Sequence, residues 1–254
     1  MIDAIIHAGG ESTRLRTMFN GPKPLVPVGD KTLLWFHLQP LLKSEVISNF
    51  IFTLRYKNDL ILKHLDDLKR ELKIKFSYII EPRPLGRAGA IRLGIEEGRI
   101  DADKPYLMSH PDDLIPVNVK KLLDYAYEAE EKGKVLTLVM AEQARNPFGI
   151  GIVEQVDGVI ELKDFKEKPE LKLIDGFLAN TGMAVYMPEA MKEFLKVPLN
   201  KITNPEDEII PKLLRENKVA VFVIERWFPV NYPADYKEIL KIGPEKLFEI
   251  LTSI

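Results

Sequence analysis

Residues 5–28 read IIHAGGESTRLRTMFNGPKPLVPV, and the rest of the chain can be interpreted from this stretch. The apolar run Ile2–Ala8 has the length of a buried strand and stops at Gly9-Gly10, where the backbone can turn sharply and approach a ligand. Small hydroxyl residues and cations follow, namely Ser12, Thr13, Arg14, Arg16 and, between two prolines, Lys23. A glycine turn with exposed amides and fixed cations is typical of a polyphosphate-binding loop. The alternative is an ordinary strand-to-helix loop with solvated cations, which the stiffness of the Pro22–Pro24 segment disfavours.

Two common phosphate motifs are excluded by the sequence. A Walker loop requires Gly-Lys followed by Ser or Thr, and no such triplet occurs. A dinucleotide fingerprint requires a third glycine, which this loop lacks.

The stretch instead resembles the signature of the sugar-1-phosphate nucleotidyltransferases, or nucleotide-sugar pyrophosphorylases, which reads A-G-G-x-G-T-R-L-x-P-L-T…P-K-P-L-x-P-V. The matching residues are Ala8, Gly9, Gly10, Thr13, Arg14, Leu15 and Pro22 to Pro27. Ser12 replaces the later glycine of the signature, and Thr17 replaces its proline. Because serine adopts a positive φ less readily than glycine, the change at Ser12 bears on the shape of the loop.

Composition narrows the classes of function. The 254-residue chain is 46% hydrophobic, enough for a sizeable core, and its net charge of −2 gives no electrostatic footprint for nucleic-acid binding. It has no cysteine, which excludes disulfides and thiolate metal sites. No apolar run approaches the roughly 20 residues that span a bilayer, and Met1 leads directly into the first strand. We therefore expect a cytoplasmic protein without nucleic-acid or membrane partners, and we leave open whether it forms a homo-oligomer.

Strands and helices alternate along the chain, as judged from apolar runs and helical spacing. In the first half the expected elements are a helix at 31–43, a strand at 49–54, a helix at 58–72, a strand at 75–81, a helix at 88–98, a strand at 106–109, a helix at 117–132 and a strand at 135–141. In the second half they are a hairpin at 149–165 that turns at 156–158, a strand at 177–186, helices at 188–195, 206–216 and 233–254, and a strand at 220–225.

This order implies an α/β fold with a mainly parallel sheet, helices on both faces, and ligands at the carboxyl ends of the strands. The resemblance likewise implies a Rossmann-like, mixed but mainly parallel sheet. The sequence has no linker, low-complexity tract or internal repeat. We therefore expect a single domain over 1–254, with a sugar-facing β insertion around 145–187.

The run 81–90, EPRPLGRAGA, follows an expected strand and resembles the family's E/Q…P-L-G-T-A-G-A stretch, whose glycine backbone meets the nucleobase. Arg87 stands where threonine is usual. The resemblance assigns nucleotide binding to Ala8, Gly9, Gly10, Glu11, Ser12, Thr13, Glu81, Leu85 and Gly86. The alternative for the run 81–90 is a rigid Pro-Gly loop that caps the sheet.

The run 110–114, HPDDL, also follows an expected strand and resembles the family's G-D-x-L, with Pro111 in place of glycine. The match places Asp112 on the metal-binding aspartate, and a carboxylate beside a phosphate loop is the hard oxygen ligand that Mg²⁺ requires. Asp113 is then a neighbour or a helix cap, and His110 a structural residue.

The second metal carboxylate of the family lies in W-x-D-x-G-T-P, which corresponds to Trp227–Pro233 in this chain. Pro229 occupies the aspartate position, so that ligand is absent. Asn231, two places on, offers an amide oxygen, which is a poorer ligand for Mg²⁺ than a carboxylate. The metal prediction is therefore Mg²⁺ on Asp112 and Asn231.

Two motifs in the second half are assigned to the sugar phosphate by the resemblance. The run 165–169 matches x-x-E-K-P, in which Glu167 can accept two sugar hydroxyls and Lys168 can neutralise a phosphate. Asn180, in a match to N-T-G, would meet sugar hydroxyls, and Gly149 is placed in the same site. On its own, a Lys-Glu-Lys run is typical of a solvated turn.

The resemblance implies an Mg²⁺-dependent enzyme that transfers a nucleoside monophosphate from a nucleoside triphosphate to a sugar 1-phosphate and releases pyrophosphate. Arg14, Lys23 and Asp112 would be its catalytic residues. The alternative is a non-catalytic, nucleotide- or sugar-binding regulatory homologue, which the departures at Ser12, Pro111 and Pro229 favour.

Glu81 decides the expected base. An ionised glutamate only accepts hydrogen bonds, and guanine presents N1–H and the 2-amino group side by side, whereas uracil and thymine place one N–H between two carbonyls. We therefore expect GTP, and with it a manno-configured sugar such as mannose or a manno-heptose, as in the family's guanylyltransferases. The alternative is a Glu81 side chain that turns to solvent or pairs with Arg83.

Overall fold

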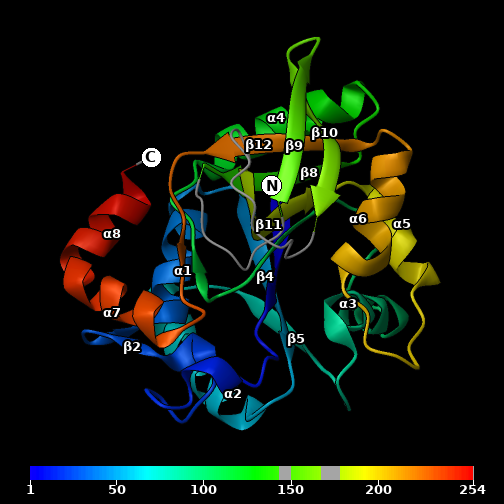
Figure 1. Ribbon diagram of the computed structural model, residues 1–254. Coiled ribbons are helices and arrows are strands. Elements are labelled where there is room, and N and C mark those ends of the chain that lie inside the picture. The colour runs from blue at the N-terminus through cyan, green and yellow to red at the C-terminus, as the bar shows by residue number, and fades with distance from the viewer. Residues whose placement is uncertain (143–149, 167–177, 254) are drawn as a thin grey trace. The chain divides into compact units, whose positions relative to one another are not determined.

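The computed structural model describes residues 1–142, 150–166 and 178–253 (Figure 1). The chain forms two compact units, each assembled from separate stretches of sequence. The first unit comprises Met1–Pro84, Ser109–Val119 and Trp227–Ile254, and the second comprises Leu85–Met108 and Lys120–Arg226. The expectation of a single domain with a β insertion stays a prediction.

The first unit is built on three parallel strands in the order β5-β4-β1. These are β1 (Ile2–His7), β4 (Ile47–Leu54) and β5 (Phe76–Ile80). Consecutive residues of β1, Ala4 to Ile6, are fully buried, which is the pattern of a parallel strand covered on both faces. All three strands point the same way, so their carboxyl ends meet at one edge of the sheet, and the 9–25 stretch follows β1 there.

The helices of the first unit follow from local sequence signals. In α1 (Leu33–Lys43) the Thr32 hydroxyl caps the first turn by accepting the Trp35 N–H at 3.3 Å. In α2 (Asn58–Leu72) the buried residues recur at helical spacing, as Ile61, Leu65 and Leu68. The remaining elements are η1 (Thr13–Leu15), η2 (Lys23–Leu25), β2 (Pro27–Val28), β3 (Lys31–Thr32), β7 (Asp113–Leu114), β13 (Phe228–Pro229), α7 (Pro233–Ile242) and α8 (Pro244–Thr252).

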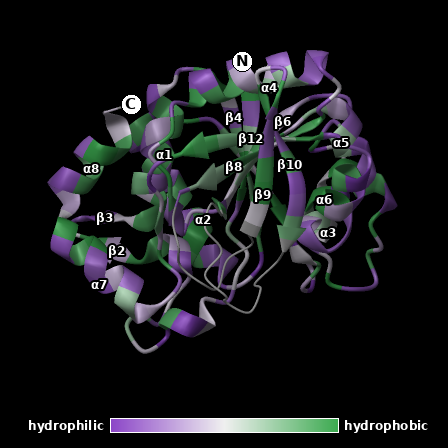
Figure 2. Ribbon diagram, turned by 45° about the horizontal axis from the view of Figure 1, so that its top comes forward, coloured by the Kyte–Doolittle hydropathy of each residue, from purple (hydrophilic) through white to green (hydrophobic). Residues whose placement is uncertain are grey.

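A hydrophobic cluster joins the end of the chain to the phosphate-loop stretch. Apolar residues alternate with polar ones along α7 and α8, as the coloured bands in Figure 2 show. The cluster brings together Leu15, Val26, Val28, Leu33, Phe36, Leu114, Val230, Tyr236, Ile239, Leu247 and Leu251. The loop after β1 and the segment around residue 230 therefore rest on one core, although some 200 residues separate them in sequence.

The second unit contains a mixed sheet in the order β6-β11-β8-β12-β10-β9. β8 and β12 are parallel, and the other neighbours are antiparallel. The β9–β10 hairpin turns through Asp157 and Gly158, both with positive φ, as a two-residue hairpin requires. The strands are β6 (Tyr106–Ser109), β8 (Leu136–Ala141), β9 (Ile150–Val156), β10 (Val159–Lys166), β11 (Leu178–Tyr186) and β12 (Val219–Ile224). The helices are α3 (Gly86–Glu96), α4 (Val119–Glu131), α5 (Pro188–Glu193), η3 (Phe194–Lys196) and α6 (Pro205–Arg215).

The predicted mixed α/β class is confirmed, and the predicted helices and strands are found to within a few residues at their ends. The two-residue strands β2, β3, β7 and β13 were not predicted, because they are too short to show a period. Among the described helices, none has both the length and the apolar character needed to cross a bilayer.

Candidate active site

The loop after β1 takes its shape from Ser12. This residue has φ 57° and ψ 28°, a left-handed conformation that glycine adopts most readily and that costs serine about 1 kcal/mol. The Ser12 hydroxyl accepts a hydrogen bond from the backbone N–H of Lys23 at 2.6 Å. A hydrogen bond is worth a comparable amount, about 1 kcal/mol, and it ties the loop to the Pro22–Pro24 segment. Ser12 therefore adopts a positive φ at the position where the signature has glycine.

Lys23 is held at both ends. Its backbone begins the short helix η2 between Pro22 and Pro24, and its side chain points at two oxygens. The ammonium donates to Asp112 Oδ2 at 2.5 Å and to Asn231 Oδ1 at 2.9 Å. Lys23, predicted to contact phosphate, therefore lies within hydrogen-bond distance of both predicted metal ligands, Asp112 and Asn231.

A cavity of about 240 Å³ opens beside this cluster, entirely within the first unit. Its lining combines backbone of the glycine turn, two cations and one carboxylate. The residues are His7, Ala8, Gly10, Ser12, Thr13, Arg14, Lys23, Pro24, Pro111 and Asp112. Exposed backbone with Arg14 and Lys23 makes a surface that suits an anion with several oxygens.

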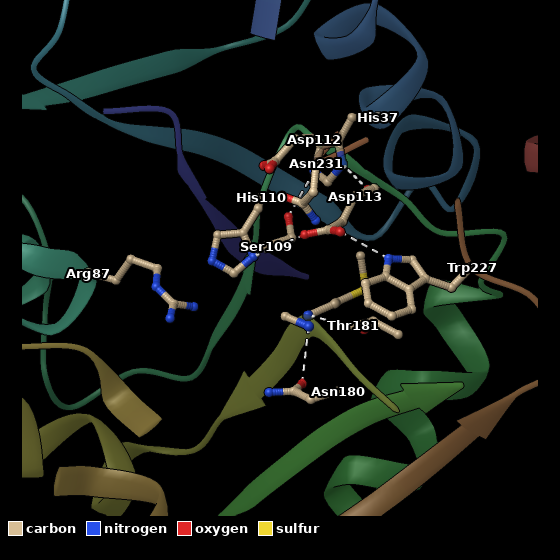
Figure 3. Close-up of polar contacts among 12 residues, drawn as sticks. His37, Arg87, Ser109, His110, Asp112, Asp113, Asn180, Thr181, Trp227 and Asn231 are labelled. Atoms are coloured by element: carbon tan, nitrogen blue, oxygen red, sulfur yellow. Dashed lines mark hydrogen bonds and ion pairs between the residues drawn. The ribbon is translucent and has the colours of Figure 1, made fainter. Parts of the chain in front are cut away.

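The backbone of Asp112 and of its neighbour Asp113 is held by contacts with the segment around residue 230. Its carbonyl accepts the Val230 N–H at 2.8 Å, and Asp113 next to it pairs with Pro229 in the β7–β13 ladder. The indole Nε1 of Trp227 donates to Asp113 Oδ1 at 3.0 Å, and Figure 3 shows the ring aimed at this carboxylate. Asp113 is therefore a buried structural partner of the C-terminal segment.

His37 is buried against Asp113 and also supports this segment (Figure 3). Its Nδ1 lies 3.0 Å from the Asp113 carbonyl and its Nε2 lies 2.9 Å from Ser109 Oγ. Burial lowers the pKa of His37 to about 4, so the ring is neutral at pH 7. A carbonyl only accepts, so Nδ1 carries the proton and Nε2 accepts from the serine hydroxyl.

The other cations of the loop have defined partners. The Arg14 guanidinium lies 5.3 Å from the ring centroid of Tyr232, within cation–π range. Glu11 lies 3.0 Å from Arg55 and 3.9 Å from Arg16. Glu11 was predicted to bind nucleotide, and its carboxylate is directed at these two arginines.

Glu81 lies against the glycine turn. A Cβ placed on Gly9 would lie 2.9 Å from Glu81 Oε1 and 3.4 Å from the Arg55 backbone nitrogen, so a larger residue there would have to displace the Glu81 carboxylate. The carboxylate at the end of β5 thus reaches the loop that follows β1. The structure brings together two residues that the sequence assigned to nucleotide binding from separate motifs.

In the second unit, Leu85 and Gly86 begin α3 against a neighbouring turn. Gly86 has φ 76°, and a Cβ there would lie 2.3 Å from the Thr203 carbonyl oxygen. The Thr203 N–H donates to the Leu85 carbonyl at 2.9 Å, and Arg87 forms an ion pair with Glu206 at 2.6 Å. Arg87, which stands where threonine is usual, is therefore used within this unit to hold the start of α6.

The predicted sugar residues are only partly described. Asn180 Oδ1 accepts the Gly182 N–H at 3.0 Å, within β11 of the second unit (Figure 3). Gly149, Glu167 and Lys168 lie outside the described residues. The roles assigned to all four stay predictions.

For a metal ion, the described residues offer oxygen rather than a cluster of carboxylates. Across residues 1–142, 150–166 and 178–253, no three His, Asp or Glu side chains come together as a metal site. The Asp112 carboxylate and the Asn231 amide nevertheless converge on one cation, the Lys23 ammonium. Two convergent oxygens suit Mg²⁺, which usually takes one or two protein ligands and fills its shell with phosphate and water.

Sequence reasoning missed Tyr232, Asp235, His37 and Trp227 as parts of this site. Asp235 could have been found, because Pro at the first and Asp at the third helical position form a readable helix-start signal. Trp227 is the first residue of the W-x-D-x-G-T-P match, which assigned it no role. Tyr232 and His37 lack a signal of their own, because their partners Arg14 and Asp113 lie far away in sequence.

Comparisons with known proteins identify the family and the fold. The family model described as "Nucleotidyl transferase" matches residues 3–239. Mannose-1-phosphate guanylyltransferase 1 of Arabidopsis thaliana is 26% identical over 246 residues, which cover 96% of this chain and 65% of that protein. The mannose-1-phosphate guanylyltransferase catalytic subunit beta of Xenopus tropicalis is 25% identical over 235 residues, covering 92% and 62%. The chain thus spans just under two thirds of the length of these relatives.

Two solved structures share the fold. HddC from Yersinia pseudotuberculosis, complexed with GMP-PN, aligns with a TM-score of 0.74 at 22% identity and covers 95% of this chain and 99% of its own. A UDP-glucose pyrophosphorylase complexed with UDP-glucose aligns with a TM-score of 0.77 at 18% identity, covering 95% and 98%. At these identities the likeness establishes the fold alone.

Proposed function

Because the chain belongs to the nucleotidyl transferase family, we propose that it joins a nucleoside triphosphate to a sugar 1-phosphate and forms a nucleotide sugar. In this reaction a phosphate oxygen of the sugar phosphate attacks the α-phosphorus of the triphosphate. The bond from the α-phosphorus to the bridging oxygen breaks, and pyrophosphate leaves with the electron pair. The observation that carries the proposal is the cavity after β1, in which Arg14 and Lys23 face the glycine turn and Asp112.

The chemistry requires alignment and charge neutralisation more than proton transfer. A phosphate monoester has a second pKa near 6, so the nucleophile is already largely ionised at neutral pH. Arg14 and the backbone amides of the 9–13 turn would hold the triphosphate and stabilise the charge that moves onto pyrophosphate. Lys23 would neutralise the phosphates as they approach one another.

Asp112 and Asn231 would hold Mg²⁺, because their oxygens already meet at a single cation. When bound, Mg²⁺ would supply positive charge shared between phosphate oxygens. In the free protein the Lys23 ammonium takes that place, so Lys23 must turn from these oxygens to the phosphates when the substrates bind.

GTP is the triphosphate that the site favours. Glu81 places a carboxylate at Gly9, and its two acceptor oxygens suit the adjacent N1–H and 2-amino groups of guanine. The names of the guanylyltransferase relatives support the same base and a manno-configured sugar phosphate. Asn180, with Gly149, Glu167 and Lys168, would select the sugar.

A second candidate, a regulatory homologue that binds nucleotide without turnover, has one observation in its favour. Pro229 replaces the second carboxylate, and the neutral Asn231 shares its oxygen with Lys23. The two candidates differ in turnover and not in binding.

The deciding experiment measures pyrophosphate release in the presence of Mg²⁺. It combines each of five nucleoside triphosphates, UTP among them, with each member of a panel of sugar 1-phosphates. We expect release with GTP and a manno-configured sugar 1-phosphate. Nucleotide binding without release for any pair would favour the regulatory candidate, and a preference for UTP or dTTP over GTP would contradict the role given to Glu81.

A further inference from the structure

The segment 227–232 contacts both phosphate-loop cations through two adjacent residues. Asn231 Oδ1 accepts from the Lys23 ammonium at 2.9 Å, and the Tyr232 ring lies 5.3 Å from the Arg14 guanidinium. The two cations come from one stretch of chain, but they are nine positions apart and point from different turns. A single short segment therefore meets the charged lining of the cavity at two points.

The segment is fastened at both of its ends. At its start the Trp227 indole donates to Asp113, and the Val230 N–H donates to the Asp112 carbonyl. At its end, Asp235 in the first turn of α7 accepts two backbone N–H groups through Oδ2. These are the N–H of Asn231 at 3.1 Å and the N–H of Tyr232 at 2.8 Å. The backbone that presents the amide and the ring is thus held by Asp235.

We propose that Tyr232 and Asp235 are positioning residues for the polyphosphate, Tyr232 by orienting Arg14 and Asp235 by fixing the backbone at 231–232. The inference rests on the proposed function only in that the cavity binds a polyphosphate. In the W-x-D-x-G-T-P pattern that this stretch resembles, threonine stands at position 232, so the ring is a feature of this chain.

The Tyr232 ring can orient the Arg14 guanidinium because the two groups are in contact at the surface. Both side chains are exposed, Tyr232 to 37%, and an exposed arginine loses conformational freedom when it binds an anion. A ring that already orients the guanidinium removes part of that cost before the ligand arrives. An exposed cation–π contact is worth about 0.5–1 kcal/mol, which corresponds to a two- to five-fold change in affinity.

The test uses inorganic tripolyphosphate as the probe, because it has phosphates but no base or sugar. Calorimetry measures its affinity for wild type, Tyr232→Leu, Tyr232→Phe, Arg14→Met and the double variant Arg14→Met/Tyr232→Leu. We expect Tyr232→Leu to bind about two- to five-fold more weakly and Tyr232→Phe, which keeps the ring, to bind as wild type does. In the Arg14→Met background the leucine substitution should have no further effect, because the pair is already broken.

Asp235 is tested with the same probe and a matched control. Asp207 occupies the equivalent third position of α6 and accepts the Asn204 N–H at 2.8 Å, in the second unit. Asp235→Ala and Asp207→Ala should lower the melting temperature alike, but only Asp235→Ala should weaken tripolyphosphate binding. Asp235→Asn, which keeps an acceptor oxygen, should restore most of the affinity.

Four results would overturn the proposal. Equal losses in Tyr232→Leu and Tyr232→Phe would remove the role of the ring, and so would a leucine effect that persists without Arg14. Normal tripolyphosphate affinity in Asp235→Ala would remove the role of the cap. A wild-type protein that does not bind tripolyphosphate would overturn the phosphate site itself, and that outcome is distinct from the other three because it appears before any substitution.

Discussion

Replacement of Lys23 by methionine should strengthen the binding of a divalent cation in the absence of nucleotide. The ammonium lies 2.5 Å from Asp112 Oδ2 and 2.9 Å from Asn231 Oδ1, so a metal that uses these oxygens must first displace it. The side chains of Lys23 and Asp112 are only 16% and 20% exposed, which limits screening by solvent. Hydrogen bonds to charged groups are worth about 1.5–3 kcal/mol, and each 1.4 kcal/mol is a factor of ten in affinity. We therefore expect Lys23→Met to bind Mn²⁺ roughly 10- to 100-fold more tightly.

The assay is titration of Mn²⁺, a spectroscopically visible substitute for Mg²⁺, followed by the signal of the free ion in electron paramagnetic resonance. Arg14→Met is the matched control, because it removes the other cation of the cavity, whose described contact is with Tyr232 and not with Asp112. It should leave Mn²⁺ affinity near that of wild type. Adding Asp112→Asn to Lys23→Met should abolish the gain. Unchanged or weaker Mn²⁺ binding by a folded Lys23→Met protein would refute the reasoning, even if its turnover falls by the roughly 100-fold expected from losing a preorganised charge.

Three further predictions concern neighbouring groups. Asp112→Asn should reduce the Mg²⁺ dependence of turnover more than Asn231→Ala does, because a carboxylate is the stronger ligand. If Asn231→Ala does not change the Mg²⁺ titration, Asn231 is not a metal ligand and only Asp112 is. Ser12→Ala should lower the free energy of unfolding in urea by about 1 kcal/mol, since it loses the 2.6 Å bond from the Lys23 N–H and keeps the left-handed strain, whereas Ser12→Gly should be near neutral because it loses both. Burial lowers the pKa of His37 to about 4 from 6.5, so the unfolded chain binds its proton first on acidification. Stability should therefore fall between pH 6.5 and pH 4 by roughly 3 kcal/mol from this group; urea unfolding at the two pH values should show a smaller fall in His37→Gln, and an equal fall would exclude it as the cause.

The fold could be predicted from sequence where one local signal sufficed. The apolar run before Gly9 marked β1, helical spacing of leucines marked α1 and α2, and Asp157-Gly158 marked the turn of the β9–β10 hairpin. In each case the residues that carry the signal lie within a few positions of the element they form. The ladder between β7 and β13 could not be found in this way, because each strand has two residues and the pair is some 115 positions apart.

The candidate site was predictable residue by residue but not as a constellation. The resemblance singled out Lys23, Asp112 and Asn231 from three motifs, assigning Lys23 to phosphate and the other two to the metal. Their convergence spans 89 and 208 positions of sequence and depends on the shared core beneath them. The sequence also left the φ of Ser12 open, because that conformation is stabilised by a bond to a residue 11 positions away.

The loss of the second carboxylate changes what the Lys23 cluster does before the substrates arrive. With Asn231 neutral, the cluster contains one positive and one negative charge and is balanced without a metal. With a second carboxylate the cluster would have a net charge of −1, and a divalent cation could bind to it without nucleotide. In the proposed reaction, a metal would enter this balanced cluster once triphosphate oxygens had drawn Lys23 away and added negative charge of their own. By linkage, nucleotide must then raise the affinity for the metal by the same factor as the metal raises the affinity for nucleotide. The substitution at Pro229 is thus compatible with turnover, provided that nucleotide and metal bind together.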